Sequence, residues 1–324
     1  MAFIWKLKSN KNFLVMKTLR MIGMALFTVL MCVNFASCSN DDNDINIEKQ
    51  QLNEYGLPVK IANNVIYYKT SNGQPLSFGI KEAKIKVKSN TYLNGYGTIE
   101  FNSDLTTLEG CKIGDETVTI ISFPASLNEI DNFLFKSSMN SLQTILVDEN
   151  NACYSSYDGC LYDKKQSTLI YCPQNKTSIS FPATIVTIGH SSCERTALTE
   201  VNIPDNVTVI EGHAFEDCKN LANITFPKNL IKIGVQAFGY CESLQSITLP
   251  EKVNSIGFIA FEMCSSLSKI YCKATTPPTL DDQNIPRYPF PYGVSIYVPS
   301  DSYDEYKSAK IWDKYKNFLV PYKF

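Results

Sequence analysis

Residues that commonly carry out acid–base catalysis or bind metals are scarce in this chain. Its 324 residues include only two histidines. It contains no G-x-x-x-x-G-K-[ST] phosphate loop, no G-x-G-x-x-G dinucleotide fingerprint and no G-x-S-x-G nucleophile motif. The eleven cysteines include no C-x-x-C pair, which argues against a zinc site of the usual spacing. We therefore predict a protein without catalytic residues, metal or cofactor.

A strong charge of one sign is also missing, which argues against nucleic acid as a partner. The formal charge of the whole chain is −2. The segment from Met1 to Cys38 holds five lysines and arginines and no acidic residue, so the rest has 25 basic and 32 acidic residues, a formal charge of −7. A mildly acidic chain has no general electrostatic attraction to phosphate backbones. Hydrophobic residues make up 44% and charged residues 19%, which fits a folded chain.

The apolar run from Met21 to Val33 is too short to span a membrane comfortably and follows two basic residues, as in a signal peptide. It leads into Phe35-Ala36-Ser37-Cys38, which resembles a bacterial lipobox with phenylalanine in place of the usual leucine. The resemblance implies cleavage before Cys38 and lipid attachment to that residue, so that residues 1–37 are a lipoprotein signal peptide. An ordinary secretory signal, cleaved after Ser37 or nearby, is the alternative.

Residues 38–51 are polar and acidic, and we expect them to form a solvated tether. An acidic stretch directly after the cysteine resembles the surface-export signal of Bacteroides-type lipoproteins. That resemblance implies an outer-membrane lipoprotein, exposed at the cell surface and held in the membrane by lipid on Cys38. A plain flexible linker is the alternative. Several acyl chains would anchor the protein firmly, because each buried CH₂ contributes about 0.8 kcal/mol.

The chain has a clear internal repeat. Cys218, Cys241 and Cys264 are evenly spaced, in segments that read IEGHAFEDCKNLANITFP, IGVQAFGYCESLQSITLP and IGFIAFEMCSSLSKIYCK. The shared pattern is L-x-x-I-x-[IFL]-P-x-x-[VL]-x-x-I-G-x-x-A-F-x-x-C-x-x. A fixed period of roughly 20–30 residues is typical of a solenoid, whose units bury their apolar faces by stacking on one another.

Each repeat is expected to contain one short strand followed by a turn. Alternation around Ile224-x-Phe226 has a period of two, and Pro227 ends the strand because proline cannot donate to a ladder. The Ala-Phe-x-x-Cys segment would then place a ring and a thiol at fixed depths in the core. The predicted interior columns are Phe215, Phe238 and Phe261 beside Cys218, Cys241 and Cys264.

This pattern closely resembles the BspA-like leucine-rich repeat family over three tandem units. The resemblance implies an α/β-type solenoid with short parallel strands, mostly β and irregular structure. Its leucine-rich repeats would each be about 23 residues long, within the usual range for such repeats. It also implies a cell-surface protein that binds host or neighbouring-cell proteins. A degenerate unit precedes the three repeats: Ser192 and Cys193 take its Ala-Phe positions, and Thr196 takes its cysteine position.

The repeats are expected to lie between an N-terminal lead-in and a C-terminal cap. A hairpin insertion is expected within the repeats. In it, Asp158-Gly159 is a turn signal, and a second polar turn follows at Lys164 to Ser167. In the cap, we expect a last strand at Ser295 to Pro299 and a short helix from Tyr303 to Tyr315, capped by Asp301 or Ser302. The predicted segments are 52–104 for the lead-in, 105–280 for the repeats, 148–173 for a hairpin insertion and 281–324 for the cap.

The cysteines after the signal peptide and lipid site are expected to be buried free thiols that pack as small hydrophobic side chains. Stacked strands lie about 4.8 Å apart, within reach of a disulfide, but side chains in one column point the same way. A disulfide between Cys160 and Cys172 across the hairpin stays open as an alternative. His190 lies three residues before Cys193, which takes a core position, so no Cys-His nucleophile is expected. His213 is expected at the surface.

The strands also predict a candidate binding surface. Their leucines and isoleucines should face the core, so the residues between them should face outward on one continuous sheet. Hydroxyl and amide groups on that face would suit a protein or glycan ligand, although few aromatic anchors are present for a tight interface. Simple solvation of the sheet is the alternative. We refer to this set as the outward row; it consists of Thr144, Leu146, Ser178, Ser180, Glu200, Asn202, Asn223, Thr225, Ser246, Thr248, Lys269 and Tyr271.

Two functions from different classes fit these features. The leading hypothesis is a non-catalytic, lipid-anchored cell-surface protein, adhesin-like, that binds a host or neighbouring-cell protein or glycan. The alternative is a structural or accessory envelope lipoprotein that scaffolds partner proteins. Nothing in the sequence names the ligand.

Overall fold

The computed structural model describes residues 51–80, 85–113, 115–130, 134–135, 139–281 and 287–324. The predicted signal peptide, Cys38 and all of the acidic tether except Gln51 lie outside the described residues. Gln50 to Phe324 forms one compact unit. Within the described residues, no helix is both long enough and apolar enough to cross a membrane.

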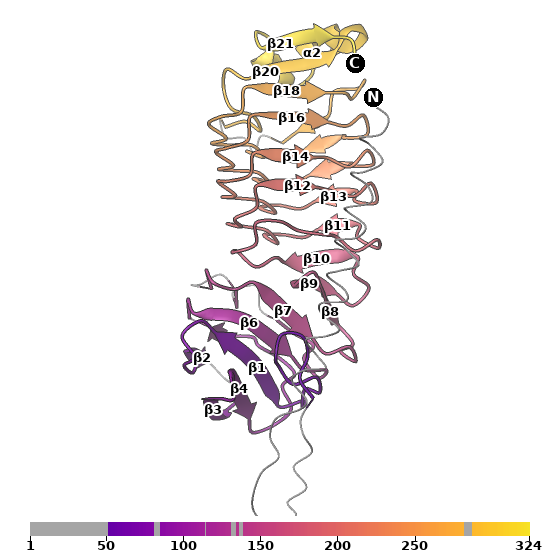
Figure 1. Cartoon of the computed structure of the whole chain (residues 1–324). Helices are drawn as coiled ribbons and strands as arrows, with labels where there is room; N and C mark the ends of the chain where they lie inside the picture. Colours follow the sequence, from indigo (N-terminus) through magenta and orange to yellow (C-terminus); the bar gives the residue numbers. More distant parts are fainter. Residues whose placement is uncertain (1–50, 81–84, 114, 131–133, 136–138, 282–286) are drawn as a thin grey trace, which may run out of the picture. The chain divides into compact units, whose positions relative to one another are not determined.

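The N-terminal part of this unit contains a five-stranded sheet in the order β3-β4-β1-β6-β7 (Figure 1). β1 pairs antiparallel with β4 and β6, whereas β6 and β7 are parallel. β2 and β5 form a separate antiparallel pair. The bounds are β1 Val65–Thr70, β2 Phe78–Ile80, β3 Val87–Leu93, β4 Tyr96–Phe101, β5 Cys111–Ile113, β6 Val118–Phe123 and β7 Thr144–Val147.

The central strand β1 is buried on both faces, which explains its almost continuous apolar sequence. Ile66 and Tyr68 belong to a large core cluster on one face, whereas Val65 and Tyr67 form a smaller one with Leu57 on the other. The partners in both clusters come from sequence positions that follow no fixed spacing. Both clusters are separate from the main core between Cys160 and Leu319, although the larger one also includes Leu161 and Tyr171 of the hairpin insertion.

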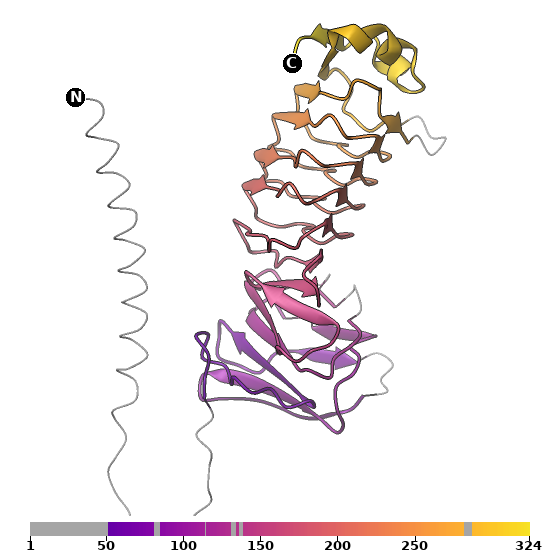
Figure 2. The ribbon, with the colours of Figure 1, turned by 90° about the vertical axis from the view of Figure 1, so that its right-hand side faces the viewer.

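The repeats place short parallel strands in two rows, which Figure 2 shows on opposite sides of the ribbon. In both rows a repeat position pairs with itself one repeat later, as Ser246 does with Lys269 and Lys232 with Ser255. The front row, which faces the viewer in Figure 1, consists of β12 Glu200–Asn202, β14 Asn223–Thr225, β16 Ser246–Leu249 and β18 Lys269–Cys272. The back row consists of β11 Thr187–Ile188, β13 Val209–Ile210, β15 Lys232–Ile233, β17 Ser255–Ile256 and β19 Thr279–Leu280.

The predicted phenylalanine column is confirmed. The rings of Phe215, Phe238 and Phe261 are fully buried and stacked, with centroids 5.2 Å apart and interplanar angles of 8° and 6°. Phe290 continues the column, with its centroid 5.8 Å from that of Phe261. Cys193 occupies the equivalent position in the preceding repeat and is also fully buried, as the pattern predicted.

The predicted thiol column lies beside the rings, and each thiol bonds to the backbone of the previous repeat. The Sγ of Cys218, Cys241 and Cys264 donates to the carbonyl oxygens of Cys193, Phe215 and Phe238 at 3.0, 3.2 and 3.0 Å, respectively. Thr196, at the cysteine position of the earlier repeat, places its Oγ1 3.1 Å from the Cys218 Sγ. A small side chain with a donor suits this position, which explains why the repeats of this chain carry cysteine or threonine there.

Two positions in each repeat adopt a left-handed backbone although they are not glycine. One precedes the alanine of the Ala-Phe pair and the other precedes the cysteine. The set comprises Ser191, Arg195, His213, Asp217, Gln236, Tyr240, Ile259 and Met263, with φ between 49° and 60°. Such a backbone costs non-glycine residues free energy, so the stacked contacts on either side must hold it in place.

The hairpin insertion has the predicted turns and three antiparallel strands. Asp158 and Gly159 have φ of 49° and 73°, as a tight hairpin turn requires. The insertion joins the back row, because β10 pairs in parallel with β11. The strands are β8 Tyr154–Tyr157, β9 Cys160–Asp163 and β10 Thr168–Tyr171.

The cap adds two strands, β20 and β21, to the front row beyond β18. The predicted strand at Ser295–Pro299 is confirmed, but the predicted helix is shorter and broken. Ala309 has an extended ψ of 144° and Ile311 a φ of 70°, which interrupt the helical backbone. Ser302 stands at the N-cap without a side-chain capping hydrogen bond. The bounds are β20 Ser295–Pro299, η1 Ser300–Ser302, α2 Tyr303–Ser308, η2 Trp312–Tyr315 and β21 Leu319–Tyr322.

Candidate functional site

The outward row is solvent-exposed over the repeats. Ile247 and Ile270 are buried, whereas the residues on either side of each point away from the core. Tyr271 is half-buried because it packs against another tyrosine. Nine members are exposed: Ser178, Ser180, Glu200, Asn202, Asn223, Thr225, Ser246, Thr248 and Lys269.

The expected continuity of the sheet under this row is not found. β12 and β14 form a two-stranded sheet, whereas β16 and β18 belong to a separate four-stranded sheet. Ser178 and Ser180 lie outside any strand. Short strands with few ladder bonds, ended by proline, allow the front row to separate into pieces while the core beneath stays stacked.

The first two members of the row, Thr144 and Leu146, lie in the N-terminal sheet on β7 and are half-buried. Leu146 packs against the small cluster of Leu57, Val65 and Tyr67. Its side chain is therefore part of the N-terminal packing, contrary to the expected outward array. The accessible part of the row begins at Ser178.

A groove of about 670 Å³ opens at the carboxyl ends of the front strands. Two members of the outward row, Thr225 and Thr248, line it. The other polar residues of the groove were not predicted from the sequence. Five of them come one or two positions after a strand-ending proline: Asp205, Lys228, Asn229, Glu251 and Lys252. The sixth, Lys273, stands at the proline position itself, after β18.

The polar groups of this groove are held by contacts between neighbouring repeats. Lys228 Nζ lies 2.7 Å from Asp205 Oδ2, and this interaction lowers the pKa of the Asp205 carboxyl. Lys252 Nζ donates to Asn229 Oδ1 at 2.7 Å. Since these pairs are exposed, they contribute little to the free energy of folding. Their main effect is to fix the positions of the charged groups.

The front face becomes aromatic toward the cap. Tyr271 and Tyr297 occupy paired positions on β18 and β20, and their rings stack with centroids 4.6 Å apart and an interplanar angle of 15°. Tyr322 contacts both rings edge-on, at 5.7 and 5.6 Å, and Phe324 contacts Tyr322 at 5.1 Å. Of these residues, Tyr271 was predicted in the outward row. Tyr297 could have been added from the alternation in β20, but Tyr322 depends on the unpredicted pairing of β21.

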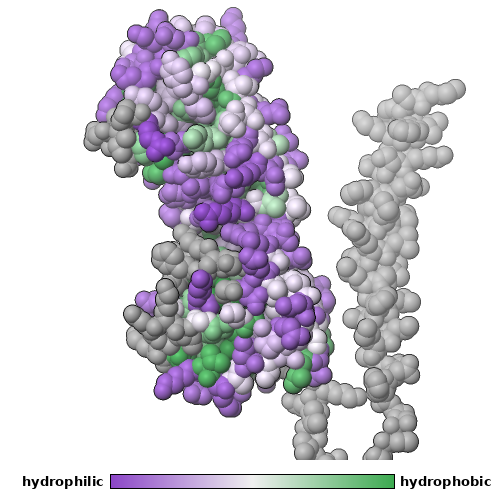
Figure 3. All heavy atoms as spheres, turned by 90° about the vertical axis from the view of Figure 1, so that its left-hand side faces the viewer, coloured by the Kyte–Doolittle hydropathy of each residue, from purple (hydrophilic) through white to green (hydrophobic). Residues whose placement is uncertain are grey.

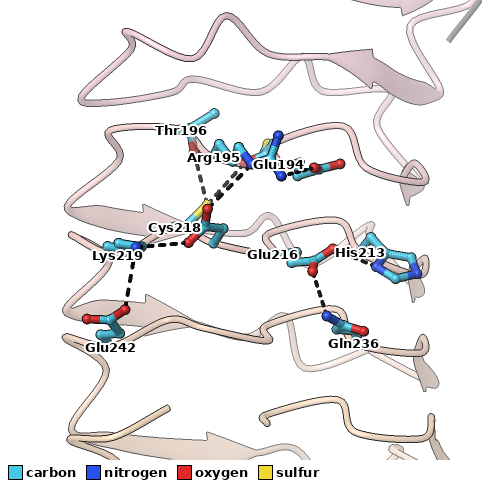
Figure 4. A network of polar contacts seen from close by, with 11 residues as sticks. Glu194, Arg195, Thr196, His213, Glu216, Cys218, Lys219, Gln236 and Glu242 are labelled. Atoms are coloured by element: carbon cyan, nitrogen blue, oxygen red, sulfur yellow. Dashed lines mark hydrogen bonds and ion pairs between the residues drawn. The ribbon is translucent and has the colours of Figure 1, made fainter. Parts of the chain in front are cut away.

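Figure 4 shows a second polar network, which connects turns of successive repeats. Arg195 Nε lies 3.4 Å from Asp217, and Lys219 lies 3.6 Å from Asp217 and 3.7 Å from Glu242. In the same view, His213 Nδ1 lies 2.6 Å from Glu216 Oε2. These partly exposed pairs cross-link repeats, and their geometry contains no nucleophile.

The two histidines do not form the Cys-His pair considered from the sequence. Their rings contact each other at a tilt of 52°, with centroids 5.2 Å apart, whereas Cys193 is fully buried. A Cβ at Gly212 would lie 3.6 Å from the His190 ring, so the turn at Gly212 packs close to that ring. Among the described residues, no group of three or more histidines, cysteines or acidic residues has a geometry suited to a metal ion.

None of the described cysteines is in a disulfide, and among them only Cys153 is exposed. Burial raises the pKa of the Cys218 thiol to about 11, and it does the same for Cys272. The Cys160 and Cys172 thiols contact each other, and the thiol of Cys160 has a raised pKa for this reason first and because of burial second. The alternative disulfide between them is absent from the described structure.

Figure 3 shows the side of the molecule that lies to the left in Figure 1. Hydrophilic residues predominate there, and hydrophobic residues form only small patches over the repeats. Large exposed apolar areas often mark protein interfaces or membrane contacts, and the described repeats show no such area on this side. The candidate site therefore remains the outward row with the groove and the tyrosines at its C-terminal end.

The fold and surface together define a class of protein: a leucine-rich repeat solenoid with a polar front face. The chain belongs to the family described as BspA type leucine rich repeat region, which it matches in six copies over residues 85–183 and 186–280. The match begins inside the segment that we expected to be a lead-in. Repeats of this kind are typical of non-catalytic interaction proteins.

Solved structures of similar chains include bacterial proteins described as leucine-rich. A leucine rich cell surface protein from Faecalibacterium prausnitzii is 24% identical, with a TM-score of 0.47 over 64% of this chain and 52% of that one. The pneumococcal vaccine antigen PcpA is 21% identical, with a TM-score of 0.49 over 67% of this chain and 57% of that one. The chain thus matches little more than half of each. No curated protein shows a significant match.

Proposed function

We propose that this protein is a non-catalytic cell-surface protein that binds a protein or glycan ligand through the outward row. The observation that carries the proposal is the row itself: nine polar residues that are exposed over successive repeats. Within the paired strands β12 and β14, and again within β16 and β18, neighbouring strands lie about 4.8 Å apart, so equivalent side chains there have a regular spacing. An extended ligand could contact several repeats at once, and each contact would add to the affinity.

The test is a binding screen of the compact unit Gln50–Phe324 against matrix proteins and glycans, followed by substitution of the row. Replacing Asn223, Thr225, Ser246 and Thr248 together with alanine should weaken binding to the ligand found. The fold should persist, because exposed substitutions usually change stability by about 0.5 kcal/mol or less each.

A matched control variant changes Lys232, Ser255 and Thr279 to alanine on the back row, where they are exposed or half-buried. Its affinity should equal that of the wild type. If the front-row variant is folded and binds as tightly as the wild type, the outward row is not the site. The insertion at residues 148–173 would then be the next surface to test.

We further propose that lipid on Cys38 holds the protein in the outer membrane. The order of basic residues, apolar run and small residues before Cys38 supports this. Cys38→Ala should release the protein from the membrane fraction and abolish uptake of labelled fatty acid. Cys32→Ala, within the same signal segment, is the control and should leave both unchanged. A wild-type protein that takes up no fatty acid would contradict the proposal.

A further inference from the structure

We infer that the C-terminal end of the outward row binds an acidic glycan, a sugar chain that carries carboxylate or sulfate groups. The inference rests on the proposed function and adds to it the ligand class and the place. Three features meet there: the groove beside Thr225 and Thr248, the lysines along its edge, and the tyrosines of β18 and β20.

The lysines supply the charge. Lys228 is paired with Asp205, which offsets its charge locally. Lys252 is held by the neutral amide of Asn229, and the Lys273 ammonium lies 6.0 Å from the centroid of the Phe324 ring. Those contacts orient the two ammonium groups without cancelling their charges. Together with Lys228 they leave the groove with three positive charges against the two carboxylates of Asp205 and Glu251.

The tyrosines supply a surface for the apolar face of a sugar ring. One face of the Tyr271 ring is covered by Tyr297. On the other side the strand register places Thr248 opposite Tyr271, and a threonine is too small to cover the ring. Tyr271 is partly exposed, with Tyr322 against its edge, and its face away from Tyr297 lies on the side of Thr248, which also lines the groove. Aromatic faces carry partial negative charge and attract the weakly positive C–H groups of a sugar ring.

The hydroxyl groups complete a pattern suited to a sugar. Thr225 and Thr248 are exposed at the edge of the groove, in successive repeats, and can donate and accept hydrogen bonds. A protein partner would more often be met by several closely packed buried anchors, whereas this surface offers one open ring beside hydroxyls and ammonium groups. The aromatic ring, the hydroxyl groups and the ammonium groups together suit an acidic glycan better than they suit a protein partner.

The experiment measures binding of Gln50–Phe324 to heparin and to polygalacturonate, with dextran as a neutral sugar chain. We expect both acidic chains to bind and dextran to bind at least about tenfold more weakly. Binding to the acidic chains should weaken as salt rises from about 0.01 to 0.15 M, because the Debye length falls from about 30 to 8 Å. Equal binding of dextran, or no binding of either acidic chain, would overturn the inference.

Substitutions then locate the site. Lys252→Gln with Lys273→Gln should weaken binding by about tenfold or more, as expected for the loss of two surface charge contacts. Tyr271→Ala should weaken it by about fivefold or more through loss of the ring face. The controls are Lys232→Gln on the back row and Tyr292→Ala, whose side chain is 88% exposed and whose ring contacts Phe318. Both should stay within about twofold of the wild type.

A substitution that strengthens binding serves as a further control, because misfolding would weaken binding and not strengthen it. Glu251→Gln removes one carboxylate from the groove and should tighten binding to heparin by about two- to fivefold. If groove variants leave heparin affinity unchanged, or Glu251→Gln weakens it, the inference is wrong. If only a protein ligand binds, and the outward-row variant abolishes that binding, the glycan inference falls while the proposed function stands. If no ligand of any class binds, both fall.

Discussion

The N-terminal sheet and the repeats bury their apolar residues in different ways. In the repeats, Phe238 lies between Phe215 and Phe261, so a ring is packed against copies of itself from either side. In the N-terminal sheet, the Tyr68 ring lies over Gly97 of a neighbouring strand, a contact that occurs once. The first kind of core is specified by a period in the sequence, whereas the second is specified only by the pairing of strands.

This difference predicts how a substitution in each region should change stability. A column residue has two equivalent neighbours, so its loss affects the repeat on each side. A residue of the N-terminal sheet has neighbours of many kinds, and its tolerance depends on the space left at that one place. The predictions below test this comparison, from the largest expected effect to the smallest.

Phe238→Ala should lower the free energy of unfolding by about 3–5 kcal/mol, because it removes a fully buried ring between two stacked rings. Urea unfolding of Gln50–Phe324 measures this loss. Phe324→Ala, at a ring that is 50% exposed, is the control and should cost less than about 1 kcal/mol. A comparably small loss for Phe238→Ala would mean that the column does not carry the stability of the repeats.

Alkaline pH should destabilise the repeats through their thiols. Burial raises the pKa of Cys218 from 9.0 to about 11, so the folded state binds a proton that the unfolded state has released. The associated stability is fully present below about pH 9 and is lost as pH rises through 11, a change of about 3 kcal/mol for this thiol. Urea midpoints at pH 8 to 11 should fall less steeply for Cys218→Ala than for the wild type. Parallel curves would contradict the effect.

Gly97→Ala should destabilise the N-terminal sheet by about 1–3 kcal/mol, since a Cβ there would lie 2.0 Å from the Tyr68 ring, which is fully buried and cannot move freely. Gly79→Ala on β2 is the matched control, because its Cβ would meet nothing closer than 3.9 Å. Urea unfolding again reads out the result. Equal effects of the two substitutions would show that this contact is not tight.

Met263→Asn should stabilise the repeats by about 0.5–1 kcal/mol, the smallest of these effects, because asparagine accepts a left-handed backbone more readily than methionine does. Met263 has a φ of 57° and is 58% exposed, so little packing is lost. Ser265→Asn, at an exposed neighbour without such a backbone, is the control and should be neutral. The thermal midpoint should rise for the first variant alone. A fall would mean that the Met263 side chain makes contacts that outweigh the backbone cost.

Much of the repeat region could be predicted from sequence because its signals are local and recur. The prolines after the front strands, the Ala-Phe-x-x-Cys segment and the Asp158-Gly159 turn each specify a nearby conformation, and the structure has each of them. The cap helix was predicted too long. Its pattern continues through Tyr315, but the backbone breaks at Ala309 to Ile311, where Ile311 and Trp312 turn into the core.

Only part of the candidate site could be predicted from the sequence. Alternation within each strand identified Thr225 and Thr248 as outward residues, and they are exposed. Alternation also predicted that Leu146 faces outward with them. In the structure, however, Leu146 packs against the small cluster of Leu57, Val65 and Tyr67. Alternation assigns residues to the two faces of a strand, but which face another part of the chain covers depends on contacts between distant residues.

The sequence by itself determined that the chain repeats with a fixed period, which rings and thiols stack, and where each front strand ends. These features follow from interactions between a residue and its own equivalent one repeat away. Only the tertiary structure decided how β1 takes its partners, that β20 and β21 extend the front row, and that Lys252, Lys273, Thr248 and Tyr271 come together at one edge. Those outcomes depend on packing between non-equivalent residues far apart in the chain, and no period in the sequence encodes such contacts.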